Sequence, residues 1–441
     1  MPSNRRPVER WIIDPLTNFV NNSTASGMVL FASAIAALII SNSAWADAFH
    51  HLWETHFAIS IGSFSIDKSL HHWINDGLMS MFFFVVGLEL KREIMAGELK
   101  NPRNAMLPIF GAIGGMIVPA LIFIAFNAGK PSMNGWGIPM ATDIAFALGV
   151  IYLLGDRVPV SLKIFLTALA IIDDLGAVLV IAFFYTSDFS ALSLFTGIGF
   201  MFVLLIANRM GVRSALFYGL VGICGMWTAF LMSGIHATIA AVLAAFTIPA
   251  DVRISEVEYI KKMEKLLDKF RKATPNDVTL VTPEQLHIVD DVVKASNDAL
   301  TPLQRLEHAM HPVVAFVVMP VFALANAGVA FNSELLGNLG SPLALGVLLG
   351  LLVGKSFGIF GFSWLAVKTG IASKPHGTNW NQFVGVSFLG GIGFTMSLFI
   401  TTLAFDDPGF TELAKMSILI GSMAAGLIGF LLLKSFTKPT S

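Results

Sequence analysis

Charged side chains are scarce in this chain. Asp, Glu, Lys and Arg make up 13% of its 441 residues and apolar residues 55%, whereas soluble domains carry about 25% charged residues. This scarcity excludes an ordinary soluble protein and predicts an integral membrane protein. The formal net charge of −1 shows no basic excess of the kind that binds nucleic acid. Cys224 is the single cysteine, which excludes an intrachain disulfide and leaves the redox compartment open.

Long apolar stretches follow one another along the chain. Six of them contain no charged residue apart from one leading glutamate: 104–129, 189–208, 214–250, 334–354, 375–405 and 416–433. Five more contain few charges: 27–44, 72–90, 136–154, 162–184 and 309–329. Since about 20 apolar residues cross a bilayer, division of 214–250 at its Ser233-Gly234 pair predicts twelve transmembrane helices in a single all-α membrane domain over residues 1–441.

The basic residues predict the orientation of these spans. Only Lys68, Lys130 and Lys415 would lie on one side of the membrane, and Lys355 would lie within a span. All other Lys and Arg residues would lie on the side that holds both chain ends. Since basic loops stay in the cytoplasm, we expect both termini to be cytoplasmic.

A short soluble segment, residues 54–68, interrupts this pattern. Residues 56–61 and 63–67 alternate apolar and polar side chains around Gly62-Ser63, which predicts a short external β-hairpin. An exposed hairpin edge can pair with a second copy of the chain, so a homodimer through this hairpin is one expectation. A loop that only covers the mouth of the bundle is the alternative.

Two further segments are predicted to lie outside the bilayer core. Residues 251–305 would form a cytoplasmic helical insertion, because apolar side chains recur at helical spacing and Thr282-Pro283 marks a helix start. It is either a regulatory element or a tolerated insertion. Residues 5–20 place apolar side chains on one helix face beside arginines, which predicts an amphipathic helix on the inner membrane surface.

Charged residues inside the apolar stretches indicate the function. Asp173 and Asp174 lie within 162–184, Asp143 lies within 136–154, and Lys355 lies in the tenth span. A charge at the centre of a membrane helix costs about 2.5 to 3.5 kcal/mol on insertion scales, so such residues usually line an ion or proton path. We therefore expect these four residues to carry the chemistry.

Buried carboxylates can hold either a proton or a small cation. Burial disfavours the charged form of a carboxyl, and a hard cation such as Na⁺ prefers oxygen ligands. Asp173, Asp174, Asp143 and Thr142 supply such oxygens, with Asp173 and Asp174 as the expected Na⁺ ligands. Competition at one site that opens to one side at a time would couple Na⁺ to H⁺ movement, with no cofactor. Lys355 is the expected charge partner, and a fixed Asp–Lys bridge that only joins helices is the alternative.

Two glycine-rich runs predict broken helices. Residues 135–139 precede Asp143 in the fourth span, and residues 390–396 lie in the eleventh. Matched breaks in two halves of a transporter mark its binding site, so spans three to five and ten to twelve are predicted to be inverted repeats. Glycines that serve only helix packing are the alternative.

Several motifs resemble those of the NhaA family of bacterial sodium/proton antiporters. That family is itself one of the known examples of inverted repeats in transporters. The resembling segments are 87–93, 141–149, 168–176, 233–237, 306–312, 354–355 and 391–397. The resemblance implies an electrogenic, pH-regulated antiporter of the bacterial inner membrane that exports Na⁺ or Li⁺ against entering H⁺. It implies that Asp174 and Asp173 bind ion and proton, and that Asp173 forms a bridge to Lys355. It also implies that Thr142 and Asp143 lie where the broken helices cross.

The resemblance also implies a set of residues that respond to pH. Those that match the family's cytoplasmic funnel are Glu89, Arg92, Glu93, Glu307, His308 and His311. His236 matches a further position tied to the pH response, and a packing histidine is the alternative there. The family usually has a shorter link between spans eight and nine, so residues 251–305 are a departure from it.

Two other classes of protein use similar residues. A sodium-selective channel would conduct Na⁺ without moving H⁺ in exchange. An intramembrane aspartyl protease needs two aspartates directed at one water molecule, and adjacent residues project about 100° apart on a helix. Asp173 and Asp174 therefore favour a transporter over a protease.

Overall fold

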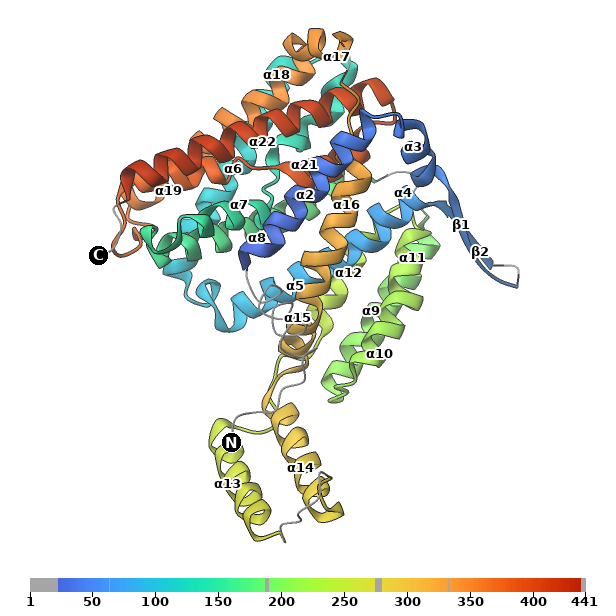
Figure 1. Ribbon diagram of the computed structural model, residues 1–441, viewed down its shortest axis with the longest axis vertical. Coiled ribbons are helices and arrows are strands. Elements are labelled where there is room, and N and C mark those ends of the chain that lie inside the picture. Colours follow the sequence, from blue (N-terminus) through green and yellow to red (C-terminus); the bar gives the residue numbers. More distant parts are fainter. Residues whose placement is uncertain (1–22, 63, 187–189, 274–279, 332, 438–441) are drawn as a thin grey trace.

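The computed structural model describes residues 23–62, 64–186, 190–273, 280–331 and 333–437, which form a helical bundle with one small sheet (Figure 1). In the first half the helices are α2 (Ser23–Ser41), α3 (Ala46–Glu54), α4 (Leu70–His72), η2 (Trp73–Leu78), α5 (Met79–Ala96), η3 (Glu98–Lys100), α6 (Pro102–Asn127), η4 (Pro131–Met140), α7 (Ile144–Leu153), η5 (Gly155–Arg157), α8 (Val160–Phe184) and α9 (Ala191–Arg209). Those labelled η are 3-10 or π-helical segments that continue or join the α-helices. The predicted surface helix at residues 5–20 lies outside the described residues.

The second half continues the same architecture. Its helices are α10 (Ala215–Leu220), η6 (Val221–Trp227), α11 (Thr228–Leu231), α12 (Ala237–Thr247), α13 (Glu256–Lys272), α14 (Pro283–Ala299), α15 (Pro302–Val313), η7 (Val314–Val318), α16 (Met319–Asn326), α17 (Ser333–Gly337), η8 (Asn338–Gly340), α18 (Pro342–Leu349), η9 (Gly350–Lys355), α19 (Ser356–Lys368), α20 (Trp380–Leu389), α21 (Phe394–Ala404) and α22 (Pro408–Phe436).

Many of these helices are long and apolar enough to cross a membrane. Within the described residues, seven continuous helices meet that test, and three bent pairs raise the number to ten. Two shorter apolar helices, Ala215–Leu231 and Ala237–Thr247, stand beside them, on either side of the predicted division at Ser233-Gly234. The positive φ of Gly234, 80°, lets the chain turn there.

The tenth predicted span is displaced in the structure. The charge-free stretch 334–354 ends just before Lys355, whereas the continuous helix runs from Pro342 to Lys368. Lys355 therefore lies near its middle, and its side chain is fully buried. The charge does not end the helix because a carboxylate inside the bundle compensates it.

The predicted hairpin is present. Strand β1 (His56–Ile61) pairs antiparallel with β2 (Phe64–Ser69), and Ile61 lies opposite Phe64 across the turn. Gly62 has a φ of 62°, which suits a tight turn. Trp73 Nε1 donates to Phe57 O at 2.8 Å, so a side chain of the bundle holds the hairpin.

Small residues allow the central helices to approach closely. A Cβ at Gly358 of α19 would clash with the backbone oxygen of Gly114 on α6, and a Cβ at Gly114 would clash in turn with Gly358 O. Such contacts are typical of membrane helices, which associate by close packing. The Gly114–Gly358 contact fixes the helix that carries Lys355 against α6.

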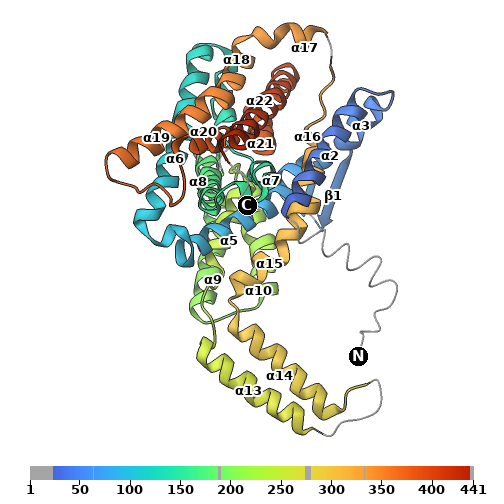
Figure 2. The same cartoon turned by 60° about the vertical axis from the view of Figure 1, so that its left-hand side comes forward.

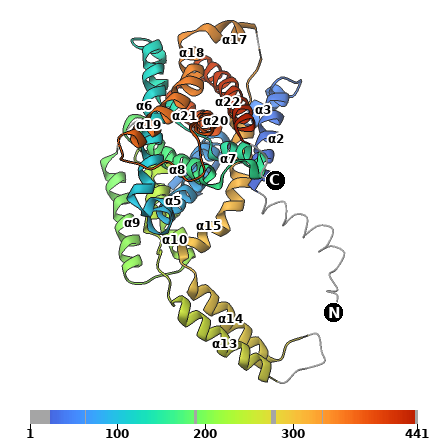
Figure 3. The same ribbon diagram turned by 90° about the vertical axis from the view of Figure 1, so that its left-hand side faces the viewer.

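The segment between α12 and α15 forms a pair of helices apart from the bundle (Figures 2 and 3). Helices α13 and α14 each begin with a reciprocal capping box, at Ser255 and Thr282. Their shared core contains the buried residues Leu266, Ala273, Ile288 and Ala295, and it is separate from the two clusters of the bundle.

Candidate functional site

The two predicted breaks lie against each other at the centre of the bundle. Helices η4 and α7 are bent by 42° and helices α20 and α21 by 45°. Asp143 N donates to Ile392 O at 2.6 Å, and Thr142 Oγ1 donates to Gly390 O at 2.8 Å. Each broken segment therefore satisfies backbone groups of the other, which unbroken helices would satisfy internally.

Asp143 joins the starts of two half-helices. Its Oδ1 accepts Phe146 N of α7 at 3.0 Å. Its Oδ2 accepts Thr395 N at 3.0 Å and Thr395 Oγ1 at 2.5 Å, both from α21. A carboxylate at a helix N-terminus satisfies free N–H groups and balances the positive end of the helix dipole. Here one side chain does so for α7 and α21 together.

Lys355 occupies the corresponding place on the carbonyl side of the crossing. Its Nζ donates to Asp173 Oδ2 at 2.5 Å, and it also donates to the carbonyl oxygen of Met140, the last residue of η4. Both side chains of the Asp173–Lys355 pair are fully buried. Lys355 thus neutralises a carboxylate and the negative end of a half-helix at once.

Asp174 differs from its neighbour in having no protein partner. Both of its carboxylate oxygens, and Oδ1 of Asp173, are buried without a hydrogen bond from the described residues. Asp174 interacts electrostatically with Asp173, Asp143 and Lys355. Since native proteins rarely leave buried polar atoms unpaired, these free oxygens fit a site that takes up a small cation or a proton.

A polar cavity approaches the aspartates from one side. It has a volume of about 620 Å³, and Glu93, Glu98, Lys163, Thr167 and Ala168 are among the residues that line it. Ala168 precedes Asp173 and Asp174 on α8 by about 7.5 and about 9 Å along the helix axis, at about 1.5 Å of rise per residue. The acids themselves are sealed from solvent.

Some of the residues that match the family's funnel lie in direct contact with one another. Arg92 donates from Nε to Glu307 Oε1 at 2.9 Å, and its Nη1 lies 3.1 Å from Glu93 Oε1. Glu89 interacts electrostatically with Glu307, Arg92 and Glu93.

The three histidines implied in the pH response lie in two different parts of the structure. His308 and His311 lie on the exposed side of the helix that carries Glu307. His236 lies elsewhere, before α12, and donates from Nε2 to Tyr185 O at 2.7 Å. The Tyr185 hydroxyl donates to Asn134 O at 2.7 Å and accepts Gly137 N at 3.2 Å. Tyr185 therefore links the end of α8 to the broken segment, and His236 contacts the backbone of that same tyrosine.

Sequence analysis missed several groups that complete the crossing. Thr395 bonds to Asp143, Ser397 Oγ donates to Ile138 O at 2.7 Å, and Ser422 accepts N–H groups of α21. The run 390–396 already contained Thr395, and its position just after the break was an available signal. Ser422 has no comparable signal, because a serine in an apolar helix usually bonds to its own helix.

Comparisons with known proteins identify the family of the chain. Residues 17–433 match the family model described as Na+/H+ antiporter 1. The chain is 49% identical over 430 residues to the Na(+)/H(+) antiporter NhaA of Oleidesulfovibrio alaskensis, covering 97% of this chain and 95% of that protein. It is 50% identical over 423 residues to the NhaA of Acidithiobacillus ferrooxidans, with 95% and 97% covered. The NhaA of Wolinella succinogenes is 48% identical over 416 residues, with 94% and 92% covered.

Proposed function

Because the chain belongs to the NhaA family of Na⁺/H⁺ antiporters, it exchanges sodium ions for protons and is not an enzyme, and we propose that the exchange takes place at Asp174 and Asp173. The observation that carries the proposal is the Asp174 carboxylate, which is fully buried and receives no hydrogen bond on either oxygen from the part of the chain that the structure describes. A buried carboxylate without a hydrogen-bond partner is suited to a ligand that binds and dissociates reversibly. Na⁺ and H⁺ are such ligands, and one site cannot hold both.

The neighbouring Asp173–Lys355 ion pair would also take part in the exchange. Asp173 is held by Lys355 at 2.5 Å. When Na⁺ binds between Asp174 and Asp173, it competes with the Lys355 ammonium for Asp173, and Thr142 and Asp143 stand next to them at the crossing. Electrogenic exchange requires more protons to return than sodium ions to leave. The titratable groups gathered at the crossing are enough for that excess.

Alternating access is supported by the way in which the crossing is built. The two broken segments are held together by a few hydrogen bonds from Thr142, Asp143 and Thr395 rather than by continuous helices. Helices α6 to α8 and α18 to α22 would form the inverted repeats, with a break in the middle member of each. Rocking of one repeat against the other would expose the aspartates to one side at a time.

Regulation by pH would begin at the funnel residues. The Arg92–Glu307 and Arg92–Glu93 contacts form a charged network that includes Glu89 and is flanked by His308 and His311. Protonation within this network would change the contacts between α5 and α15. His236 would act separately, through Tyr185 and the end of α8.

The remaining features concern topology and assembly. Twelve spans are supported when the two shorter apolar helices and the bent pairs are counted with the seven long helices. The basic loops favour cytoplasmic termini in the bacterial inner membrane. The exposed β1–β2 hairpin offers an edge through which two copies would pair.

The assay that tests the proposal follows a pH-sensitive dye in proteoliposomes. Addition of Na⁺ should move protons in the opposite direction with the parental protein, and Asp174→Asn should abolish the signal. Asp406→Asn, in the exposed loop after α21, is the matched control and should exchange normally. Normal exchange by Asp174→Asn would overturn the site assignment, and a Na⁺ flux without proton movement would favour a channel.

A further inference from the structure

We propose that Ser422 of α22 is a positioning residue for the crossing, because its hydroxyl oxygen holds the start of half-helix α21 that carries Thr395. This inference rests on the proposed function, since it concerns the geometry of the same site. Ser422 is not one of the residues expected to bind Na⁺ or H⁺. It would act through α21.

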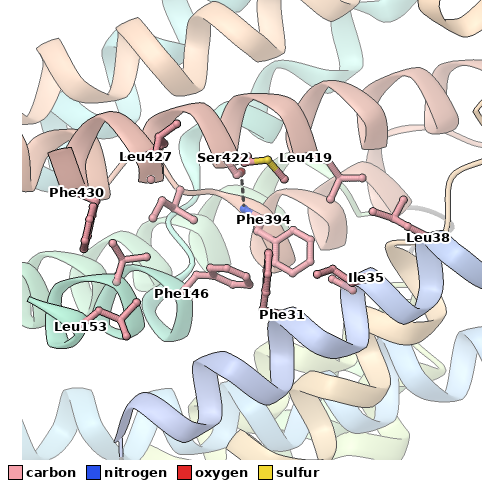
Figure 4. Close-up of a pocket in the computed structure, with 15 residues that line it drawn as sticks. Phe31, Ile35, Leu38, Phe146, Leu153, Phe394, Leu419, Ser422, Leu427 and Phe430 are labelled. Atoms are coloured by element: carbon pink, nitrogen blue, oxygen red, sulfur yellow. Dashed lines mark hydrogen bonds between the residues drawn. The ribbon is translucent and has the colours of Figure 1, made fainter.

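The start of α21 has three N–H groups that its own helix cannot satisfy, and two neighbours accept them. Gly393 N and Phe394 N donate to Ser422 Oγ at 3.2 Å and 3.1 Å. Thr395 N donates to Asp143 Oδ2 at 3.0 Å. Figure 4 shows Ser422 reaching from α22 to the backbone of Phe394. Ser422 and Asp143 thus hold the first turn of α21 between them.

The two half-helices differ in how they are capped. Helix α7 begins with Asp143, whose own side chain accepts Phe146 N. The N-cap residue of α21 is Gly393, which has no side chain that could accept a hydrogen bond. A helix that lacks a cap at its own N-terminus needs an acceptor from elsewhere when that end is buried. Ser422 is that acceptor.

The position of Ser422 corresponds to that of Asp174. Ser422 is as far from Pro408, the first residue of α22, as Asp174 is from Val160, the first residue of α8. In the proposed inverted repeats α8 and α22 are equivalent helices. Equivalent positions would therefore present a carboxylate to the crossing in one repeat and a hydroxyl in the other. A neutral acceptor caps α21 without adding a further carboxylate to Asp143, Asp173 and Asp174 that would compete for the cation.

The cavity beside Ser422 offers no substitute for its hydroxyl. An apolar cavity of about 350 Å³ lies between α2, α7, α21 and α22 (Figure 4). Its lining includes Phe31, Ile392 and Met423, and Ser422 is the one residue among the described lining with a polar side chain. Loss of the hydroxyl would leave two N–H groups of α21 facing hydrocarbon, where an unsatisfied donor is costly.

A second serine on the same helix provides a matched control. Ser417 is fully buried on α22, and its Oγ donates to Leu413 O at 2.8 Å within its own helix. Such bonds are ordinary for serine in a helix. Removal of the Ser417 hydroxyl therefore deprives no half-helix of its cap.

The test measures Na⁺-dependent proton movement in proteoliposomes for Ser422→Ala, Ser422→Thr, Ser417→Ala and Asp174→Asn. For Ser422→Ala we expect the KM for Na⁺ to rise on the order of tenfold, because an unsatisfied buried donor shifts an equilibrium by about that factor. The maximal rate should change by less than about twofold, as for loss of ground-state binding. Ser422→Thr, which keeps the hydroxyl, and Ser417→Ala should retain the parental KM.

Each outcome decides the proposal. A parental KM in Ser422→Ala, or an equal rise in Ser417→Ala, would overturn the role of Ser422. An active Asp174→Asn would instead overturn the site on which the inference rests. If Ser422→Ala does not fold, hydrogen exchange in the parental protein decides: the amides of Gly393 and Phe394 should be strongly protected, and exchange as rapid as that of the exposed loop at Asp406 would refute the cap.

Discussion

Adjacent carboxylates on α8 have opposite environments. Asp173 is hydrogen-bonded to Lys355, whereas no described residue donates a hydrogen bond to Asp174. Burial of an ion pair costs desolvation energy that good geometry only partly repays. The pair therefore contributes little net stability, but either member alone would be an unpaired charge in the bundle. Asp174 is retained in a costly state that function, rather than stability, explains.

Removal of Lys355 should destabilise the protein strongly. Lys355→Met leaves the Asp173 carboxylate buried without a partner, which costs about 3 to 5 kcal/mol. We expect a lower temperature at which half of the detergent-solubilised protein remains monodisperse in gel filtration. The double variant Asp173→Asn/Lys355→Met removes both charges and should recover much of the loss. Parental stability in the single variant would show that the pair is not closed in the membrane.

Glu258 illustrates a carboxylate in the opposite setting. It is exposed at the start of α13 and accepts Ser255 N at 2.9 Å and Ser255 Oγ at 3.1 Å. These hydrogen bonds favour the charged form and hold the pKa of Glu258 below its ordinary value. The folded state is therefore favoured by this carboxylate above the ordinary pKa, and that contribution is lost as pH falls through the folded pKa.

Because protonation of Glu258 weakens its hydrogen bonds to Ser255, the stability of the first turn of α13 should depend on pH. Amide protection over the first turn of α13, corrected for intrinsic exchange rates, should be greater at neutral pH than at a pH below the ordinary pKa of glutamate, about 4.3. In Glu258→Gln the same comparison should show a smaller difference. Equal pH dependence in both proteins would contradict the role of the carboxylate.

At the scale of helices, α6 and α19 depend on glycine where they touch. Gly358→Ala would place a methyl group against the backbone oxygen of Gly114, which cannot move as a side chain could. We expect a loss of about 1 to 3 kcal/mol in stability, as for other overpacked sites. Transport should also fall, because the displaced helix carries Lys355 one turn away.

Gly361 on the same helix is the control for that substitution. A Cβ there would meet no atom within 4 Å, so Gly361→Ala should be neutral or slightly stabilising. Thermal stability in detergent and initial transport rates would be compared for both variants. Equal effects at the two positions would show that helix propensity, and not the Gly114 contact, determines the result.

The helix breaks were partly predictable. Gly390, Gly391 and Gly393 lie at the second interruption, whereas Gly135, Gly137 and Pro139 lie within the 3-10 helix η4 and the first interruption follows them at residues 141–143. The contacts across them were not predictable in the same way. Hydrogen bonds such as Asp143 N to Ile392 O join residues far apart in the chain, and no local pattern selects such partners.

At the scale of the whole molecule, the α13–α14 pair has a core of its own. Arg253 N donates to Asp298 O at 2.9 Å, and Leu303 N donates to Pro249 O at 3.1 Å. The two ends of the insertion are therefore close together, beneath a bundle whose apolar clusters do not include it. This arrangement favours an appended element over a part of the transport core.

Deletion of that pair should leave the antiporter intact. Replacement of residues 254–297 by a short glycine-serine link should change bundle stability by less than about 0.5 kcal/mol and leave the KM for Na⁺ unchanged. Gel-filtration stability and the dye assay would be compared with the full chain. Loss of exchange in a folded deletion variant would show that the insertion belongs to the transport mechanism.

The sequence by itself determined the class of this protein and the residues worth examining. Charge is so costly in hydrocarbon that Asp143, Asp173, Asp174 and Lys355 stand out from any apolar stretch without a structure. The family resemblance already implied that Asp173 bridges to Lys355. The tertiary structure alone decided where the tenth helix begins and ends, that Asp174 has no hydrogen-bond partner among the described residues, and that Ser422 caps a neighbouring helix. The reason is physical. The cost of burial belongs to a residue and its local segment, whereas compensation of that cost depends on which distant groups the folded chain brings within hydrogen-bonding distance.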